Sequence, residues 1–457
     1  MTMTRLPLYL LLTLLLPPGP LRLLAQDLTA PLLDRSWEAT LTNPALYARL
    51  EGRLTLSLPG LANELAAENV TVDELLRSES GRRILDLTRL PALLDERNRI
   101  TNDLSVQTLG VGLKGDRWSA GIHHRVCSRV GVDYPRSLVR LLAEGNGAAI
   151  GQTLEVAPFG AATSYHELAL GLGYRLTDEL TLGARVKYLN GISDVRSRRD
   201  GRLALTTGED NFALRLEQDY RLNSSGVITF NGLGDVDVDY DRDELSLGEL
   251  LNRNSGVAYD LGLSYADDRL RLQATANDLG GRIRWTQRPT NLTFSGTSTF
   301  TGLDALRDLL NDSLSLDGAL DSLDAVLSPT RTNEAYTATG GATFLLGGEY
   351  QLRERLSVGL LLRYQQRFLG DRPGAALSAR YALLPWVTAG ANLNYVRDFG
   401  LRLGLHTYLT PGPLRLLAAT DNLFALFSGG GGSRASLRLG LSLSINRDRT
   451  NASVRNQ

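Results

Sequence analysis

The feature that most constrains the fold is a two-residue alternation of leucines that recurs along the chain from about residue 100 onward. Successive side chains of a strand point to opposite faces, so each such segment has one leucine-rich face and one small or charged face. Many of these segments run about nine to eleven residues, the length of a tilted strand that crosses a bilayer. The alternation predicts an all-β fold, a transmembrane antiparallel β-barrel, and a count of such segments gives roughly fourteen to sixteen strands. The clearest segments are 168–176, 259–265, 356–365, 401–406 and 437–446.

The face opposite the leucines carries recurrent positive charge. In a transmembrane barrel this face lines a polar lumen, where cations are hydrated or paired. Tyrosines near segment ends, such as Tyr174, Tyr188 and Tyr364, fit an aromatic belt. The alternative is a large soluble periplasmic β-protein, a sandwich or solenoid, whose strands also alternate. The residues that we predict to line the lumen are Arg175, Arg185, Lys187, Arg271, Arg363, Arg402 and Arg438.

The N-terminus predicts export. Arg5 precedes an apolar run over 6–16, and Ala25 is a small residue at a suitable cleavage point. These features indicate a signal peptide over residues 1–25, and the apolar run is too short for a spanning helix. We therefore expect the mature chain in the cell outer membrane.

The strand pattern is preceded by an N-terminal segment of a different kind and is interrupted by three stretches after residue 104. Residues 26–103 are predicted to form an N-terminal plug-like segment with a first strand and helices, because leucines over 60–98 have mostly helical spacing. The barrel is predicted over 104–446 and a polar tail over 447–457. Helical insertions are predicted near 136–145, 245–253 and 303–327. Their expected role is to plug or cap the barrel, with regulation or partner binding as the alternative.

Composition excludes several function classes. The 49 lysines and arginines balance 50 aspartates and glutamates, which argues against a nucleic-acid binder. Cys127 is the sole cysteine, so neither a disulfide within the chain nor a thiolate cluster can form. We predict no cofactor, no metal site and no catalytic residue, and hence no enzyme.

The candidate chemical motifs are individually weak. His123 and His124 are adjacent, so on a strand they face opposite ways and cannot chelate one ion together. Ser164 and His166 supply residue types of a hydrolase, but any strand produces this spacing by chance. The alternating aspartates over 235–243 could bind calcium, yet an EF-hand would need glycine and glutamate where Tyr240 and Ser246 stand. We interpret these aspartates as a solvated loop, and the four glycines over 429–432 as a flexible one.

Several short motifs support a family resemblance. They are Asn43-Pro44-Ala45, Ala276-Asn277-Asp278-Leu279-Gly280 with Trp285, Leu346-Gly347-Gly348-Glu349-Tyr350, and Ala419-Thr420-Asp421-Asn422-Leu423. With the long alternating strands, the chain resembles an uncharacterised Bacteroidota family of outer-membrane barrels. That family is distantly similar to fatty-acid-transporter-like barrels and to barrels associated with type IX secretion. The resemblance implies a barrel of about fourteen strands with an N-terminal segment in or near the lumen. It carries over no ligand residue, because the matching residues look structural.

Two functions follow as hypotheses. The first is passage of a hydrophobic or small solute through the outer membrane, which plug-like insertions would gate. The second is a structural or docking barrel that binds the protein partners of a secretion or cell-surface machine. Uptake by the purified protein would favour the first, and capture of stable partner proteins would favour the second.

Overall fold

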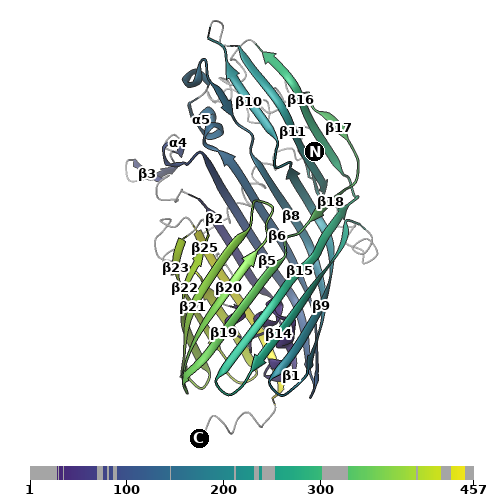
Figure 1. Ribbon diagram of the computed structural model, residues 1–457, viewed down its shortest axis with the longest axis vertical. Coiled ribbons are helices and arrows are strands. Elements are labelled where there is room, and N and C mark those ends of the chain that lie inside the picture. Colours follow the sequence, from purple (N-terminus) through teal and green to yellow (C-terminus); the bar gives the residue numbers. More distant parts are fainter. Residues whose placement is uncertain are drawn as a thin grey trace.

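The computed structural model places the alternating segments in one closed barrel wall (Figure 1). Within the described residues, 14 antiparallel strands make up this wall, as the alternation predicts. None of the helices among these residues has the length and apolar character of a membrane-spanning helix. The structure describes residues 28, 30–33, 35–68, 76–79, 82–85, 90–144, 146–209, 213–230, 236–238, 253–300, 328–397, 400–423 and 434–447.

Each wall strand pairs with its neighbours in the chain, and the last strand closes the barrel on the first. For example, Leu443 near the C-terminus lies opposite Leu56. The first position in the wall is shared by β1 (Gly52–Ser57) and β2 (Gly60–Ala67), and β18 (Tyr336–Thr339) continues β19 (Thr343–Arg353). The other strands are β5 (Arg97–Lys114), β6 (Trp118–Pro135), β8 (Phe159–Arg175), β9 (Leu180–Ser197), β14 (Ser255–Ala266), β15 (Leu270–Trp285), β20 (Leu356–Gln365), β21 (Arg372–Leu384), β22 (Val387–Val396), β23 (Gly400–Leu409), β24 (Leu414–Thr420) and β25 (Arg434–Arg447).

The outer face of the wall is apolar and exposed. Leu170 and Leu172 on β8 are each 51% exposed, whereas Ala169 between Leu168 and Leu170 is fully buried. Trp118, the first residue of β6, is 62% exposed, and Trp386, in the turn between β21 and β22, is 47% exposed. A band of leucines bordered by aromatic rings is the surface that a transmembrane barrel presents to lipid.

The two ends of the barrel differ in their connections. Six connections at one end are two to four residues long and join β5 to β6, β8 to β9, β14 to β15, β19 to β20, β21 to β22 and β23 to β24. Most connections at the other end are much longer (Figure 1). We call these the short-turn end and the long-loop end.

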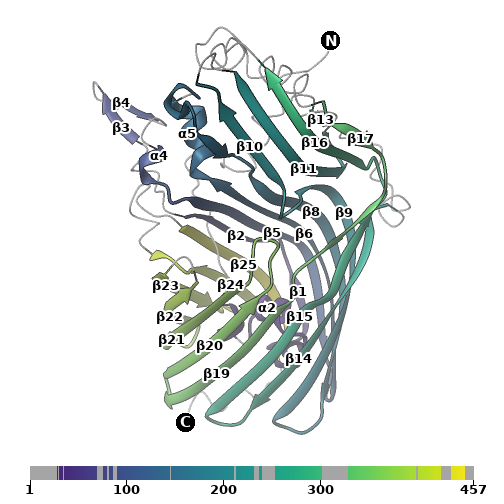
Figure 2. The ribbon, with the colours of Figure 1, turned by 45° about the horizontal axis from the view of Figure 1, so that its top comes forward.

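A further part of the same β-sheet rises from the long-loop end, beyond the barrel wall (Figures 1 and 2). Strand β9 pairs with β14 up to Asn190 and then with β11 (Leu214–Gly226) from Ser193 onward. Around β11 lie β7 (Thr153–Glu155), β10 (Arg202–Thr207), β12 (Ile228–Phe230), β13 (Val236–Val238), β16 (Thr290–Phe300) and β17 (Thr330–Thr332). We call this part of the sheet the extension.

The extension has a hydrophobic core of its own. Leu205, Leu216, Leu292 and Phe294 are buried there, together with Leu141 of helix α5 (Arg136–Glu144). Helix α5 lies where an insertion near 136–145 was predicted, and it is followed by the short helix η4 (Asn146–Ala149). The apolar face of α5 therefore covers the extension.

An N-terminal segment lies inside the barrel (Figure 2). It consists of η1 (Ala30–Leu32), α2 (Trp37–Thr42) and η2 (Pro44–Arg49), and we call residues 28–50 the plug. Ser36 Oγ accepts a hydrogen bond from Ala39 N and so caps α2, and Asn43 Oδ1 accepts one from Ala45 N and caps η2. The Asn-Pro-Ala motif is thus the start of η2.

The prediction for residues 60–98 was wrong over much of its length. Leu61 and Leu65 lie on strand β2, which pairs with both β5 and β25. A four-residue spacing is even, so it fits one face of a strand as well as one face of a helix, and the pairing partners decide. The described residues beyond β2 hold a hairpin of β3 (Leu76–Glu79) and β4 (Arg82–Leu85) and one short helix, α4 (Leu90–Leu93). The barrel wall consequently begins at Gly52 and not at residue 104.

Several predictions lie outside the described residues. They concern the signal peptide over 1–25, the insertion at 303–327, that at 245–253 apart from Arg253, the glycine run over 429–432 and nearly all of the polar tail.

Candidate functional site

Glycines on the inner wall make room for the plug. A Cβ atom at Gly110 would lie 2.2 Å from the ring of Trp37, and one at Gly121 would lie 2.2 Å from the ring of Tyr47. At Gly183 the nearest plug atom, the Ala45 nitrogen, would be 2.1 Å away. These contacts are too close for any other residue, so the small side of the leucine alternation is the seat of the plug.

Hydrogen bonds from wall side chains tie the plug to the barrel. The indole nitrogen of Trp37 donates to Gln107 Oε1 on β5 at 2.9 Å. Arg185 Nη2 on β9 donates to the Thr40 carbonyl at 2.6 Å, and Asn277 Nδ2 on β15 donates to the Thr42 carbonyl at 2.8 Å. Arg185 and Asn277 thus reach carbonyl groups at the C-terminal end of α2, which a helix leaves without intrahelical partners.

The short motifs identified in the sequence surround the plug. Asn277 belongs to one of them, and Asp421 of another accepts a hydrogen bond from the Leu28 nitrogen at 3.4 Å. Glu349 of a third is paired with Arg380, whose Nη1 donates to the Leu32 carbonyl at 3.1 Å. These residues therefore share one structural role, which is to hold the N-terminal segment.

A buried ion network lies beside the plug. Lys187 Nζ is 2.9 Å from Asp260 Oδ1 and 2.7 Å from Asp278 Oδ1. Arg185 Nε is 3.1 Å from Asp260 Oδ2, and Arg129 Nη2 is 3.1 Å from Asp278 Oδ2. The network therefore runs without interruption from Arg129 through Lys187 to Arg185 and the plug.

Glu167 is a second centre of the same network. It accepts from Arg125 Nη2 at 2.6 Å, and His123 Nε2 lies 3.2 Å from the same carboxylate oxygen. Its other oxygen is 4.0 Å from Lys187 Nζ. Buried charges are tolerated when each has such partners, and removal of one partner leaves the other uncompensated.

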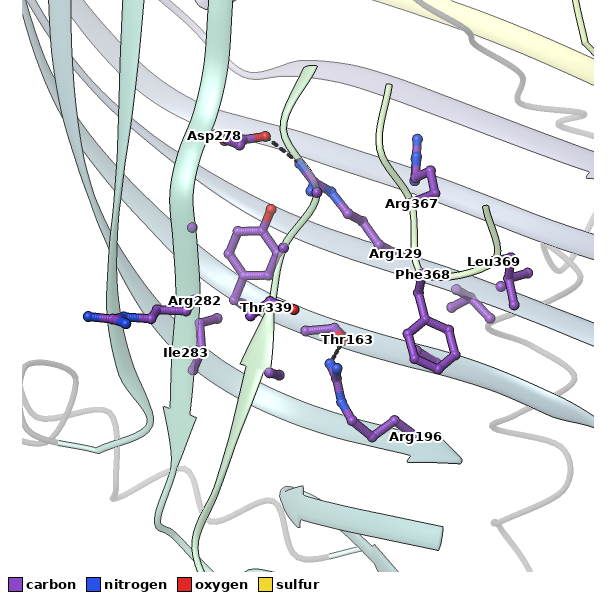
Figure 3. A pocket seen from close by; sticks show the side chains of 18 of the residues that line it. Arg129, Thr163, Arg196, Asp278, Arg282, Ile283, Thr339, Arg367, Phe368 and Leu369 are labelled. Atoms are coloured by element: carbon purple, nitrogen blue, oxygen red, sulfur yellow. Dashed lines mark hydrogen bonds and ion pairs between the residues drawn. The ribbon is translucent and has the colours of Figure 1, made fainter. Parts of the chain in front are cut away.

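A cavity of about 120 Å³ lies on the long-loop side of this network (Figure 3). Its apolar wall includes Leu189, Ile283 and Phe368, and Arg129 reaches across it to Asp278. Arg196 lies on the other side, where its Nη2 donates to Thr163 Oγ1 at 3.2 Å. The cavity thus combines an apolar wall with guanidinium and hydroxyl donors.

The barrel wall is interrupted beside the cavity. Strand β15 pairs with β19 up to Asn277 and resumes pairing, with β18, from Arg282. Asp278 between them has a φ of 59°, an uncommon left-handed conformation for a residue other than glycine. Gly281, Gly340 and Gly341 of the two facing edges line the cavity.

The seven predicted lumen residues fall on the inner face of their strands, but in different surroundings. Arg185 and Lys187 belong to the ion network, and Arg271 Nη1 lies 2.5 Å from Glu349 Oε1. Arg363 is buried, and Arg438 lies opposite Ala419. Arg402 donates to the Leu401 carbonyl at 2.9 Å, and Arg175 is half-buried near the short-turn end. That any of them lines the path of a solute stays a prediction.

The weaker chemical candidates stay apart from this site. Ser164 Oγ donates to Ser128 Oγ at 3.0 Å, while His166 Nδ1 lies 3.1 Å from His124 Nε2 on the outer face. His123 points inward to Glu167, so the two adjacent histidines do face opposite ways. Of the acidic run over 235–243 the structure describes Asp237, which pairs with Arg288. Among the described residues no group of three or more potential metal ligands is present.

Sequence reasoning missed the acidic half of the network. Glu167, Asp260 and Asp278 were not identified as lumen residues, although Asp260 stands on the inner phase of a leucine-alternating strand. A buried arginine or lysine needs an acidic partner. The predicted lumen cations therefore indicated that carboxylates would also lie at inward-facing positions of these strands.

The chain is similar to one protein family and to several solved structures. The model of the "Family of unknown function (DUF5723)" matches residues 44–421. A search of curated proteins finds no match. Similar solved structures include the toluene transporter TbuX of Ralstonia pickettii, with 11% identity over 90% of this chain and 94% of that chain and a TM-score of 0.44. The toluene transporter TodX of Pseudomonas putida has 12% identity, with 92% and 93% covered and a TM-score of 0.40. A FadL homologue of Pseudomonas aeruginosa has 12% identity, with 90% and 93% covered and a TM-score of 0.39.

Proposed function

The chain belongs to DUF5723, a family of unknown function, and we propose that it is an outer-membrane barrel which passes a small, partly hydrophobic solute. The observation that carries this proposal is the cavity that lies at the long-loop end of a closed barrel whose short-turn end holds a plug. A ligand cavity on one side of a gate is the arrangement that selective passage requires, because the solute binds before the path opens.

The outer surface supports the membrane location. Leucines such as Leu170, Leu377 and Leu401 are 51%, 58% and 58% exposed, and only a lipid environment makes so large an apolar band favourable. In outer-membrane barrels the short turns face the periplasm and the longer connections face outward. On this proposal the cavity and the extension face the cell exterior, and the plug faces the periplasm.

The plug is suited to a gate because it is held by polar contacts that can be exchanged. Arg185 and Asn277 hold backbone carbonyl groups of α2, and water can replace such donors when the plug moves. Apolar contacts hold the plug as well: Leu28 and Leu32 are buried against Leu361 of β20, and Leu33 is buried against Leu417 of β24. Passage therefore requires displacement of residues 28–50 from the wall.

Uptake by the purified protein tests the proposal. Radiolabelled benzenesulfonate or benzenesulfonamide would be added outside proteoliposomes, and the uptake of each would be measured against protein-free vesicles. Saturable uptake that falls when the cavity is filled by Leu369→Trp would support passage; Leu369 lines the cavity and is 8% exposed. Uptake equal to that of protein-free vesicles, with the barrel correctly folded, would overturn it.

The extension favours one alternative, a docking barrel. Its core of Leu205, Leu292 and Phe294 lies outside the barrel wall, where passage of a solute does not need it. A docking barrel would capture a stable partner protein from the cell surface and show no uptake. Deletion of the extension would then abolish capture, whereas in a transport protein it would leave uptake measurable.

A further inference from the structure

The ion network beside the cavity has more positive than negative groups. Each contact in it joins buried or half-buried side chains, so bulk water does not neutralise the difference. Four cations face three carboxylates, an excess of one positive charge without counting His123. The cations are Arg125, Arg129, Arg185 and Lys187, and the carboxylates are Glu167, Asp260 and Asp278.

The groups around the cavity add no compensating negative charge. Arg196 is paired with Asp194, and Arg367 Nη2 lies 2.5 Å from Asp103 Oδ2, so each of these arginines has one acid. Asp278 is the one carboxylate among the residues that line the cavity, and both Arg129 and Lys187 already contact it. The residues that line the cavity thus include more arginines than carboxylates.

The size and the walls of the cavity limit which ligand can supply the negative charge that the ion network lacks. An apolar cavity of about 150 Å³ holds one benzene molecule. The cavity here measures about 120 Å³ and has Leu189, Ile283 and Phe368 in its wall. Phe368 is also held beneath Arg196, whose guanidinium carbon is 5.9 Å from the ring centre. A compact ring-sized ligand, or a group of that size, fits this space.

We propose that the cavity binds a compact organic anion, a carboxylate or sulfonate that carries a single ring or a group of that size. Its acid group lies against Arg129, where it completes the charge of the network, and its apolar part lies against Ile283 and Phe368. Arginine suits this role because its planar guanidinium presents two parallel donors to the two oxygens of an acid group. The inference rests on the proposed function, since it names the class of solute that would be passed.

Binding to the purified protein in detergent tests the ligand class. The probes are benzenesulfonate, its neutral isostere benzenesulfonamide, benzylammonium and methanesulfonate, measured by isothermal titration calorimetry. We expect benzenesulfonate to bind at least ten times more tightly than each of the other three. Equal or tighter binding of the neutral or the cationic ring would overturn the inference.

Variants connect this binding to the cavity. Arg129→Gln should weaken benzenesulfonate binding at least tenfold, Arg129→Lys should retain part of it, and Arg215→Gln on β11 should leave it unchanged. Arg129→Gln could unfold the barrel because Asp278 loses a partner, so heat-modifiable migration is checked first. Leu369→Trp keeps every charge of the network and should abolish binding by filling the space. Wild-type binding in Leu369→Trp would contradict the assignment.

Uptake separates the failure of this inference from that of the proposed function. Uptake of benzenesulfonamide without tighter binding of the sulfonate would overturn the anion class and leave passage standing. Tight, Arg129-dependent binding of the sulfonate without uptake of either compound would support the anion site and overturn passage.

Discussion

Arg185 on β9 donates a 2.6 Å hydrogen bond to the carbonyl oxygen of Thr40, and so joins the barrel wall directly to the plug. The same guanidinium pairs with Asp260. Lys187 contacts both Asp260 and Asp278. The residue that holds the plug therefore belongs to the network that borders the cavity. We therefore expect a change in charge at the cavity to alter how firmly the plug is held.

Loss of the Arg185 side chain should loosen the plug. Arg185→Gln leaves Asp260 with one cation fewer in a buried site, and breaking a buried ion pair costs about 3–5 kcal/mol. We expect a lower midpoint for thermal unfolding and more frequent channel openings in planar bilayers. The double variant Arg185→Gln/Asp260→Asn removes both members of the ion pair and should recover part of the midpoint but not the plug contact. Unchanged openings in both variants would show that Arg185 does not hold the plug.

A larger residue in the glycine seat should displace the plug. Gly183→Val adds a Cβ that would lie 2.1 Å from the Ala45 nitrogen, while valine itself suits a strand. We expect a folded barrel with raised ionic conductance. Gly348→Val is the matched control, because Gly348 is on the lipid-facing phase and its Cβ would meet the end of the Leu272 side chain at 3.1 Å. Equal conductance in the two variants would contradict the glycine seat.

The extension should unfold without the barrel. Phe294 is 1% exposed in the core of the extension, and Phe→Ala changes in cores cost about 3–5 kcal/mol. In Phe294→Ala we expect protease added to whole cells to cleave the extension, within 200–230 or 290–300, faster than in the wild type. Heat-modifiable migration of the barrel should persist. Loss of both together would mean that the two parts fold as one unit.

Asp267 should stabilise the turn between β14 and β15 in a pH-dependent way. The backbone N–H groups of Leu270 and Arg269 donate to its carboxylate and lower its pKa. A carboxyl group with a lowered pKa in the folded state stabilises the fold above its unfolded pKa, and this contribution is lost as the pH falls through the folded pKa. Asp267→Ala should therefore lower the unfolding midpoint at pH 7, and the two midpoints should converge in acid. A difference that persists in acid would exclude the carboxylate as its cause.

The sequence predicts the barrel wall well because lipid imposes the alternation directly on residues such as Leu168, Leu170 and Leu172. It does not separate the wall from the extension, since β11 and β16 alternate in the same way over a core of their own. The helical prediction for Leu61 and Leu65 was wrong because their four-residue spacing fits one face of a helix and one face of a strand equally well.

The candidate site was only half predictable. Arg185 and Lys187 could be predicted because they alternate with the apolar residues of their strand. Asp278 lies at an irregular, left-handed position of β15, which the leucine alternation does not predict. The plug contacts of Asn277 and Asp421 join residues more than 200 positions apart from their partners, so their role emerges only when the barrel closes.

Fluorescence of the four tryptophans tests the central claim, that the leucine face meets lipid and the opposite face encloses the plug. Trp118 and Trp386 are exposed on the outer face, whereas Trp37 and Trp285 are buried inside. Variants that retain one tryptophan each would be reconstituted with lipids brominated near the headgroup. We predict strong quenching of Trp118 and Trp386 and almost none of Trp37 and Trp285. Equal quenching of all four, or a mature protein that stays in water without detergent, would contradict the account.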